Sequence, residues 1–287
     1  MKAWVVLTAA GSGSRLGATV PKALVSVDDK TILGLALERI AGSDHVQGVV
    51  VTCTPGYEKD FERVVSRSLG SDVPWMVVPG GTSRQGSVYE ALKAIVLYFD
   101  VARHNARELS PGQAVGATVD AASPIPRESA HADAEPVEEA DRSPDFGGPA
   151  ADLPVLVHDA ARCLTPTELF DSVIEAVYSG ASAVIPVMPV VDTIKAVDPA
   201  TGIVRSTLDR TTLRTVQTPQ GFRWEPLYQA HVAEASRGAS ETDAATDDAG
   251  LLEAHGVPVL TVPGDPKAFK VTVAADLVGL KRSLKKT

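Results

Sequence analysis

Short apolar runs alternate with amphipathic segments along most of the chain. The apolar runs are rich in β-branched residues and end at glycine or polar residues, which is typical of strands buried on both faces of a parallel sheet. These runs cover Ala3–Thr8, Gly48–Thr54, Trp75–Val78, Pro154–Val157, Ala183–Val187 and Val257–Val262. Apolar positions recur at helical spacing between them, in Leu33–Ile40, Phe61–Leu69 and Val88–Tyr98.

This alternation predicts an α/β fold with a doubly wound, mostly parallel sheet, because helices that connect parallel strands form right-handed crossovers. Ligands of such sheets bind beyond the carboxyl ends of the strands. One helix start is marked by Thr165, Pro166 and Glu168, which match an N-cap, a first-turn proline and a capping-box acid. The segment His158–Arg162 therefore lies on a strand-to-helix loop, where catalytic groups are common, although we expect His158 itself to be structural.

Residues 190–212 depart from the alternation. Two stretches of alternating residues flank Asp198–Gly202, a segment with the composition of a tight turn. The pattern predicts a protruding β-hairpin. Because an isolated hairpin is marginally stable in water, we expect it to pack on its own domain or on a second subunit.

Residues 101–153 also depart from it. They contain twelve alanines, six prolines, ten acids, four bases and one aromatic residue, so they carry −6 of the net charge of −9. Such a segment buries too little apolar surface to order itself. We predict a single domain over residues 1–287 with a mobile acidic insertion at 101–153.

The composition is that of an ordinary globular protein, with 44% hydrophobic and 22% charged residues. The acidic balance argues against binding to nucleic acid, which normally requires a basic face.

Cys53 and Cys163 have neither disulfide nor metal-ligand spacing, and we expect both to be buried. No stretch is apolar enough for a membrane helix, and the first apolar run leads into glycines rather than a signal cleavage site. These features predict a soluble cytoplasmic protein.

A glycine-rich loop, Gly11–Arg15, follows the first strand at once. Glycines at this place allow backbone N–H groups to approach phosphates. The spacing fits neither the dinucleotide fingerprint, which also needs an acid after the second strand, nor the P-loop. Arg15 and, seven residues later, Lys22 add two cations to the loop. The combination favours a triphosphate ligand, whose charge such cations stabilise during attack on phosphorus.

Several further motifs follow in a fixed order. They are Ala9–Arg15 with Pro21-Lys22, Gly80–Val88, His158–Arg162, Asp192–Lys195, Asp209-Arg210, Gln217–Gln220, Thr246–Asp248 and Lys270–Thr272. In this series the chain resembles the 2-C-methyl-D-erythritol 4-phosphate cytidylyltransferase family, enzymes of non-mevalonate isoprenoid biosynthesis. The resemblance extends over nearly the full length, apart from residues 101–153. It implies a Rossmann-like fold and a reaction of CTP with a polyol phosphate.

The resemblance also implies roles on the nucleotide side. Arg15 and Lys22 would stabilise the transition state at the α-phosphorus of CTP. Gly81, Thr82 and Ser87 would read the cytosine. The full set of implied nucleotide contacts is Ala9, Ala10, Gly11, Ser12, Gly13, Ser14, Gly81, Thr82, Ser87 and Ala160.

On the acceptor side, the resemblance implies that Asp159 carries Mg²⁺, with Arg162 close by. Arg210 and Lys270 would position the acceptor phosphate. The remaining implied substrate contacts are Thr193, Thr218 and Thr246. The 190–212 hairpin resembles the family's dimerisation arm, so we expect a homodimer in which the arm reaches the neighbour's active site.

Elementary electrostatics agrees with this assignment. An acceptor phosphate is already ionised at neutral pH, so no serine–histidine or cysteine–histidine pair is needed, and none is evident in the sequence. The obstacle is bringing two anions together, which requires several cations and a metal held by a carboxylate and phosphate oxygens. Arg15, Lys22, Arg210, Lys270 and Asp159 form such a set.

Three alternatives stay open at this point. A cytidylyltransferase for ribitol 5-phosphate would share the nucleotide motifs and differ in the acceptor pocket. A nucleotidyltransferase that uses another base would share the phosphate-binding loop. A non-catalytic nucleotide sensor would keep the base pocket without needing every cation.

Overall fold

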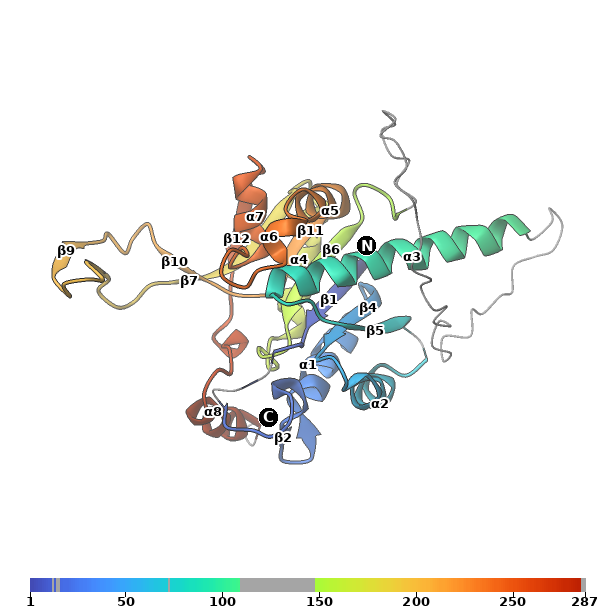
Figure 1. The fold of residues 1–287 in the computed structure, drawn as a ribbon, viewed down its shortest axis with the longest axis horizontal. Coiled ribbons are helices and arrows are strands. Elements are labelled where there is room, and N and C mark those ends of the chain that lie inside the picture. The colour runs from blue at the N-terminus through green and yellow to red at the C-terminus, as the bar shows by residue number, and fades with distance from the viewer. Residues whose placement is uncertain (12, 14–15, 72, 109–147, 285–287) are drawn as a thin grey trace.

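The computed structural model describes residues 1–11, 13, 16–71, 73–108 and 148–284, and shows one central sheet with helices packed on both faces (Figure 1). The strands of this sheet are β1 (Ala3–Thr8), β4 (Val46–Cys53), β5 (Trp75–Pro79), β6 (Pro154–Asp159), β7 (Ala183–Pro189), β10 (Arg214–Val216), β11 (Gln220–Arg223) and β12 (Val259–Pro263). The helices are α1 (Ile32–Ala41), α2 (Glu58–Leu69), α3 (Arg84–Glu108), α4 (Thr167–Tyr178), α5 (Trp224–Ala233), α6 (Ala235–Gly238), α7 (Asp248–Ala254) and α8 (Ala274–Leu284). Two short pairs, β2 (Ser26–Val27) with β3 (Lys30–Thr31) and β8 (Lys195–Val197) with β9 (Val204–Thr207), and the 3₁₀ turns η2 (Lys22–Leu24) and η3 (Pro266–Ala268) complete the described elements.

The sheet is mostly parallel, as the alternation of strands and helices predicted. β6, β1, β4 and β5 are adjacent and parallel. β11 lies antiparallel between β6 and β7, so β6 and β7 run in the same direction, and β12 pairs parallel with β7. All six predicted strands are present within a few residues of their expected ends. The two strands that the pattern did not predict, β10 and β11, are the antiparallel ones, and both are too short to show a clear period.

Each face of the sheet has its own apolar core. One core joins α1, α2 and α4 to residues such as Val5, Leu7 and Val49. The other joins α3, α5 and α7 to Trp4 and Val6, which point to the opposite face because side chains alternate along a strand. Both cysteines are buried in the first core as free thiols, as predicted, and burial raises the pKa of Cys163 to about 12.

The structure corrects the limits of the predicted insertion at 101–153. Helix α3 continues to Glu108, eight residues into that segment. Tyr98 and Phe99 of this helix are partly buried and pack on Trp4, with ring centroids 4.9 and 5.8 Å from the Trp4 ring, and residues beyond them continue the helix. At the other end, Leu153 accepts a hydrogen bond from the Trp224 backbone at 2.9 Å. The intervening residues 109–147 lie outside the described part of the chain, so the mobility of the insertion stays a prediction.

The start of α4 also differs from the prediction. Helix α4 begins at Thr167, and Pro166 occupies the N-cap position without a side-chain hydrogen bond. The hydroxyl of Thr165 donates to the Arg162 carbonyl oxygen at 2.7 Å instead of capping the helix. The capping-box prediction was therefore wrong, although the helix lies where it was expected.

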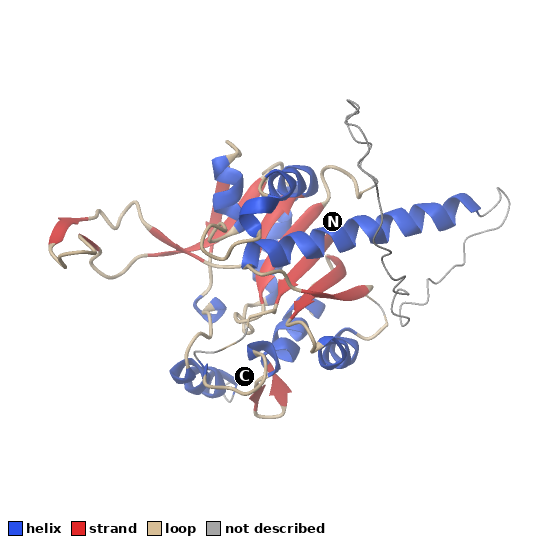
Figure 2. Ribbon diagram, viewed as in Figure 1, coloured by secondary structure: helices blue, strands red, loops and turns tan. Residues whose placement is uncertain are grey.

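The predicted hairpin at 190–212 is confirmed. β8 and β9 pair antiparallel, Gly202 has a φ of 72°, and the Asp198 carboxylate accepts hydrogen bonds from the backbone of Ala200 and Thr201. The hairpin extends away from the sheet as an arm (Figure 2), and all four residues of β9 are exposed. Within the described ranges, every helix is too short or too polar to cross a bilayer.

Strand β11 depends on a close approach to α4. A Cβ added at Gly221 would lie within 3.1 Å of the Val177 Cγ2 atom and closer still to Val173. We therefore expect Gly221→Ala to lower the free energy of unfolding by about 1–3 kcal/mol, as overpacking typically does. The measurement is urea unfolding.

Gly279→Ala is the matched control, since no heavy atom lies within 4 Å of a Cβ at this position of α8 and alanine favours a helix over glycine by about 1 kcal/mol. Equal unfolding free energies for the Gly221 variant and the unmodified protein would contradict the proposed close packing of β11 on α4.

Candidate active site

A cavity of about 510 Å³ lies beyond the carboxyl ends of β1, β4 and β6. This is the edge at which ligands of parallel sheets bind. Eleven of the predicted site residues line it together: Ala9, Ala10, Gly11, Gly13, Lys22, Gly81, Thr82, Ser87, Asp159, Ala160 and Lys270. They come from five separate segments, so the fold brings together residues that are far apart in the sequence.

The first glycine loop folds back onto Lys22. The backbone N–H of Lys22 donates to the Gly11 carbonyl oxygen at 3.4 Å. Gly13 has a φ of 69°, and a Cβ there would lie 2.7 Å from the Lys22 Cβ. A side chain at position 13 would therefore displace the lysine, which explains the need for glycine. Three predicted residues of this loop lie outside the described part of the chain: Ser12, Ser14 and Arg15.

The second glycine loop lies directly against the first. The Gly80 N–H donates to the Cys53 carbonyl oxygen at 2.8 Å, so the end of β5 stays paired with the end of β4. A Cβ at Gly80 would overlap the Ala10 methyl group and come within 2.9 Å of the Ser87 Oγ. This close approach sets Gly81 and Thr82 beside the loop of β1 in one cavity.

Three hydroxyl groups hold the second loop and the start of α3 in place. Thr82 donates to the carbonyl oxygen of Ala239 at 2.7 Å, and Ser83 to that of Gly238 at 2.5 Å. The hydroxyl of Ser87 donates back to the Ser83 carbonyl oxygen at 2.8 Å. The Ser87 oxygen keeps its acceptor capacity toward the cavity.

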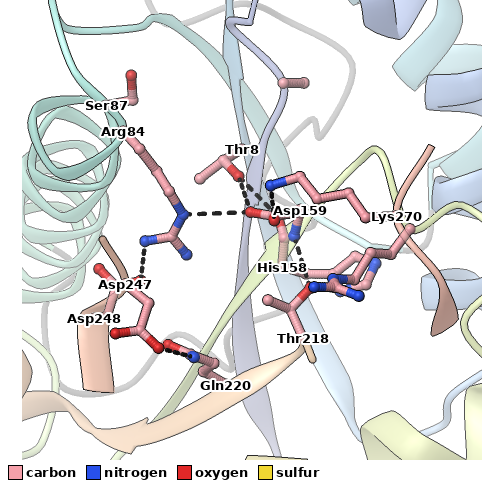
Figure 3. Close-up of polar contacts among 12 residues, drawn as sticks. Thr8, Arg84, Ser87, His158, Asp159, Thr218, Gln220, Asp247, Asp248 and Lys270 are labelled. Carbon is pink, nitrogen blue, oxygen red and sulfur yellow. Dashed lines mark hydrogen bonds and ion pairs between the residues drawn. The ribbon is translucent and has the colours of Figure 1, made fainter. Parts of the chain in front are cut away.

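Asp159, the last residue of β6, is the centre of charge in the cavity (Figure 3). Its Oδ2 atom lies 2.8 Å from the Lys270 Nζ. Its Oδ1 atom lies 3.3 Å from the Arg84 Nε and accepts a hydrogen bond from the Thr8 hydroxyl at 3.1 Å. Two cations and one hydroxyl from β1, α3 and the C-terminal segment therefore meet at one carboxylate.

These cations keep Asp159 ionised in spite of its burial. Burial by itself raises the pKa of a carboxyl group, but the charges of Arg84 and Lys270 outweigh it and hold the pKa of Asp159 well below its ordinary value. Burial would likewise lower the pKa of Arg84, yet Asp248 and Asp159 raise it above the ordinary arginine value. Asp159 and Arg84 are therefore both charged at neutral pH.

Arg84 is a site residue whose role the sequence did not indicate. It lines the cavity, and its Nη1 atom lies 2.7 Å from Asp248 Oδ2. Asp248 is buried and also lies 3.0 Å from the Nε2 atom of His231. The place of Arg84 in the motif Gly80–Val88 could have indicated this role, because the arginine stands in the first turn of a helix that follows a strand.

His158 and Thr218 support the site from behind. The Thr218 Oγ1 accepts the backbone N–H of Asp159 at 3.0 Å and lies 2.9 Å from His158 Nδ1. The His158 ring is buried and stacks edge-on against Phe170, and burial lowers its pKa to about 3. His158 is thus a neutral structural residue, in agreement with its expected role. Thr218 is outside the cavity lining, and its predicted substrate contact stays a prediction.

Arg162 acts as a clamp between two backbone segments. Its guanidinium donates to the carbonyl oxygens of Ala268 at 2.7 Å and Val216 at 3.2 Å. Ala268 lies two residues before Lys270, so this clamp helps to fix the segment that carries the lysine. Arg162 itself does not line the cavity.

The fold does not bring three further predicted residues to the cavity. Thr193 and Arg210 lie on the arm, where the Arg210 guanidinium donates to the Val191 carbonyl oxygen. Thr246 is exposed just before the start of α7. The lining of the cavity in the described chain includes none of the three.

The donor set suits a magnesium ion that is held mainly by a ligand. The described residues contain no cluster of three or more histidine, cysteine or acidic side chains that could enclose a metal. The lining of the cavity instead offers the buried carboxylate of Asp159 and the exposed Glu241. Mg²⁺ commonly binds through one or two carboxylates, waters and phosphate oxygens, so Asp159 fits such an ion together with a nucleotide.

Comparisons with known proteins agree with this geometry. The model of the 2-C-methyl-D-erythritol 4-phosphate cytidylyltransferase family matches residues 3–137 and 149–285. A relative with that name from Saccharopolyspora erythraea is 41% identical over 277 residues, which is 96% of each chain. Another, from Corynebacterium glutamicum, is 35% identical over 286 residues and covers 96% of this chain and 90% of the relative.

Solved structures show the same fold. The 2-C-methyl-D-erythritol 4-phosphate cytidylyltransferase of Thermus thermophilus superposes with a TM-score of 0.63 at 27% identity over the whole of both chains. The 4-diphosphocytidyl-2C-methyl-D-erythritol synthase of Anaerococcus prevotii superposes with a TM-score of 0.67 at 22% identity, over 99% of this chain and 96% of that one. With its glycine loops, its cation-ringed carboxylate and these matches over nearly its whole length, the chain belongs to the 2-C-methyl-D-erythritol 4-phosphate cytidylyltransferase family.

Proposed function

We propose that the protein transfers a cytidylyl group from CTP to 2-C-methyl-D-erythritol 4-phosphate and releases pyrophosphate. The observation that carries this proposal is the meeting of Lys22, Lys270 and Asp159 beside two glycine loops in one cavity. The relatives are named for the methylerythritol phosphate acceptor, which favours it over ribitol 5-phosphate.

The reaction is a displacement at the α-phosphorus. An oxygen of the acceptor phosphate forms a bond to this phosphorus, the bond to the bridging oxygen of the β-phosphate breaks, and pyrophosphate leaves with the electron pair. The acceptor oxygen is already ionised at neutral pH, so no side chain has to remove a proton. The protein has to position two anions and offset their repulsion.

The two glycine loops would hold the nucleotide. Gly11 and Gly13 expose backbone at the end of β1 beside Lys22, whose ammonium group would stabilise charge on the α-phosphate together with Arg15. Gly81, Thr82 and Ser87 would contact the cytosine, because they line the cavity on the β5 and α3 side.

Asp159 would hold magnesium, which supplies positive charge at the phosphate oxygens when it is bound. The Oδ2 atom of Asp159 contacts Lys270, so a cation held by this oxygen would take the place of the lysine ammonium group. The released ammonium group would then be available for the acceptor phosphate. Lys270 would thus contact Asp159 before the ligands bind and the acceptor phosphate afterwards.

The arm would complete the site of a second subunit in a homodimer. Several of its apolar side chains are exposed, and Val191 and Ile203 are 77% and 66% exposed. A two-stranded hairpin of this kind is marginal without a partner surface. In a symmetric dimer, the arms would bring Arg210 and Thr193 to the neighbouring cavities, where Arg210 would bind the acceptor phosphate.

We also propose a cytoplasmic location. CTP is available in that compartment, and the two buried cysteines are free thiols, as is usual in reducing compartments.

The proposed reaction is tested by measuring pyrophosphate release with CTP and each candidate acceptor. We expect turnover with 2-C-methyl-D-erythritol 4-phosphate and with CTP in preference to UTP, ATP or GTP. Activity with ribitol 5-phosphate alone would reassign the acceptor. Tight CTP binding without turnover of either polyol phosphate would indicate a nucleotide sensor.

Lys22→Ala should lower kcat about 10²–10³-fold, because charge-stabilising groups that act mainly in the transition state have effects of this size. The KM for CTP should rise much less. Steady-state kinetics measures both constants, and Lys59→Ala, which removes an exposed lysine of α2, is the control. An unchanged kcat would remove Lys22 from the mechanism.

Arg210→Ala should chiefly impair use of the acceptor, and mixing subunits tests where the arginine acts. If each arm serves the neighbouring cavity, a dimer of one Lys22→Ala and one Arg210→Ala subunit has one intact site. An equal mixture that exchanges subunits freely should recover roughly a quarter of the original activity, since half of the dimers are mixed and each has one working site of two. No recovery would place Arg210 in the site of its own subunit, and unchanged activity of the Arg210→Ala protein by itself would place the arginine outside the mechanism.

A further inference from the structure

Arg84 bridges two carboxylates that belong to different parts of the fold. Its Nε atom lies 3.3 Å from Asp159 Oδ1 in the cavity, and its Nη1 atom lies 2.7 Å from Asp248 Oδ2 at the start of α7. The arginine side chain is 23% exposed, while those of Asp159 and Asp248 are 11% and 1% exposed. A partly buried guanidinium between two buried carboxylates has little freedom to move.

The position of Arg84 would be unfavourable without these partners. It is the first residue of α3, a helix of 25 residues, and the N-terminus of a helix repels positive charge. Asp248, by contrast, stands in the first turn of α7, where a negative charge is favoured, and His231 contacts its other oxygen. Asp248 is therefore the firmly held partner of Arg84. The Arg84 side chain reaches from Asp248 to Asp159 in the cavity.

The two oxygens of Asp159 have different surroundings. The Oδ1 atom is held by Arg84 and by the Thr8 hydroxyl, both fixed by α3 and β1 (Figure 3). The Oδ2 atom lies 2.8 Å from the Nζ atom of Lys270, whose side chain is 41% exposed. One oxygen is thus anchored to the frame of the protein, and the other is bound to a long side chain that can leave.

We propose that Arg84 is a positioning residue for the transfer reaction. Through its bridge to Asp248, it holds the Oδ1 atom of Asp159 in place so that the Oδ2 atom faces the cavity and exchanges Lys270 for the metal ion. Asp248 contributes from outside the cavity, because it orients Arg84 without lining the site. This inference rests on the proposed function and adds two residues to it.

Arg84→Lys is the informative substitution. It keeps the positive charge beside Asp159, so the electrostatic attraction for a cation in the cavity is largely retained. It removes the planar fork, and a lysine ammonium cannot contact both carboxylates in the same geometry. Any change in metal binding then reports the lost orientation of Asp159 rather than lost charge.

The test measures metal binding and kinetics on the full-length protein. Mn²⁺ binding in the presence of a CTP analogue with a methylene group between the α- and β-phosphorus atoms is followed by water proton relaxation. We expect Arg84→Lys to weaken Mn²⁺ binding and to lower kcat by about 10-fold or more each, as is usual when the partner of a metal-binding carboxylate is lost. The KM for CTP should change by less than about 3-fold.

Asp248→Asn tests whether the effect passes through Arg84. On its own it should weaken Mn²⁺ binding and lower kcat in the same direction as Arg84→Lys. In the Arg84→Lys background it should add little, because the bridge is already broken. Fully additive losses in the double variant would overturn the assigned role of Asp248.

Phe61→Leu controls for a loss of stability alone. Phe61 is fully buried in α2 on the other face of the sheet, so its substitution destabilises the fold without contacting Arg84 or Asp159. It should leave Mn²⁺ binding unchanged.

Unchanged Mn²⁺ binding and kcat in folded Arg84→Lys would sink the proposal. Weaker binding of the CTP analogue with unchanged Mn²⁺ binding would also overturn it, because the arginine would then be a direct nucleotide contact. These outcomes require an active unmodified protein. An unmodified protein that fails to transfer the cytidylyl group would instead refute the proposed function.

Discussion

A buried carboxylate that stays charged requires cations around it, and this requirement organises the cavity. Asp159 ends β6 in the middle of the sheet, where burial alone would favour the neutral acid. The compensating charges come from the first turn of α3 and from the segment before α8. The side chain of Asp159 therefore joins β6 to α3 and to the segment before α8.

The cations around Asp159 differ in how firmly they are held. Arg84 lies between two carboxylates that both contact its guanidinium group. Lys270 is held through its backbone, because Arg162 donates a hydrogen bond to the carbonyl oxygen of Ala268, two residues earlier. A side chain fixed at both ends maintains geometry. A half-exposed lysine on a fixed backbone can change partners without any movement of the fold. The cluster thus combines one cation that two carboxylates hold with another whose side chain is more exposed.

The cavity of the single chain is lined by residues predicted to contact the nucleotide but not by Arg210 and Thr193 from the predicted acceptor set. Both residues lie on the arm, whose apolar side chains face solvent in the single chain. Exposed apolar surface and missing acceptor contacts occur on the same element. Pairing of two subunits would resolve both at once, which is the physical reason to treat the arm as part of a shared site.

The strands and loops of the site could be predicted from the sequence, and the contacts that arrange its charges could not. Continuous β-branched runs such as Ala3–Thr8 identify parallel strands locally, and the position of Asp159 after such a run places it at the ligand edge of the sheet. Local turn chemistry likewise identified the hairpin around Asp198. In contrast, Arg84 and Asp248 are 164 positions apart, and β11 enters between β6 and β7 in antiparallel orientation. Hydrophobic periodicity and turn residues involve only a few neighbouring positions, so the sequence shows them directly. Ion pairs across the fold depend on which distant segments become neighbours, and this is determined only when the chain packs into its tertiary structure.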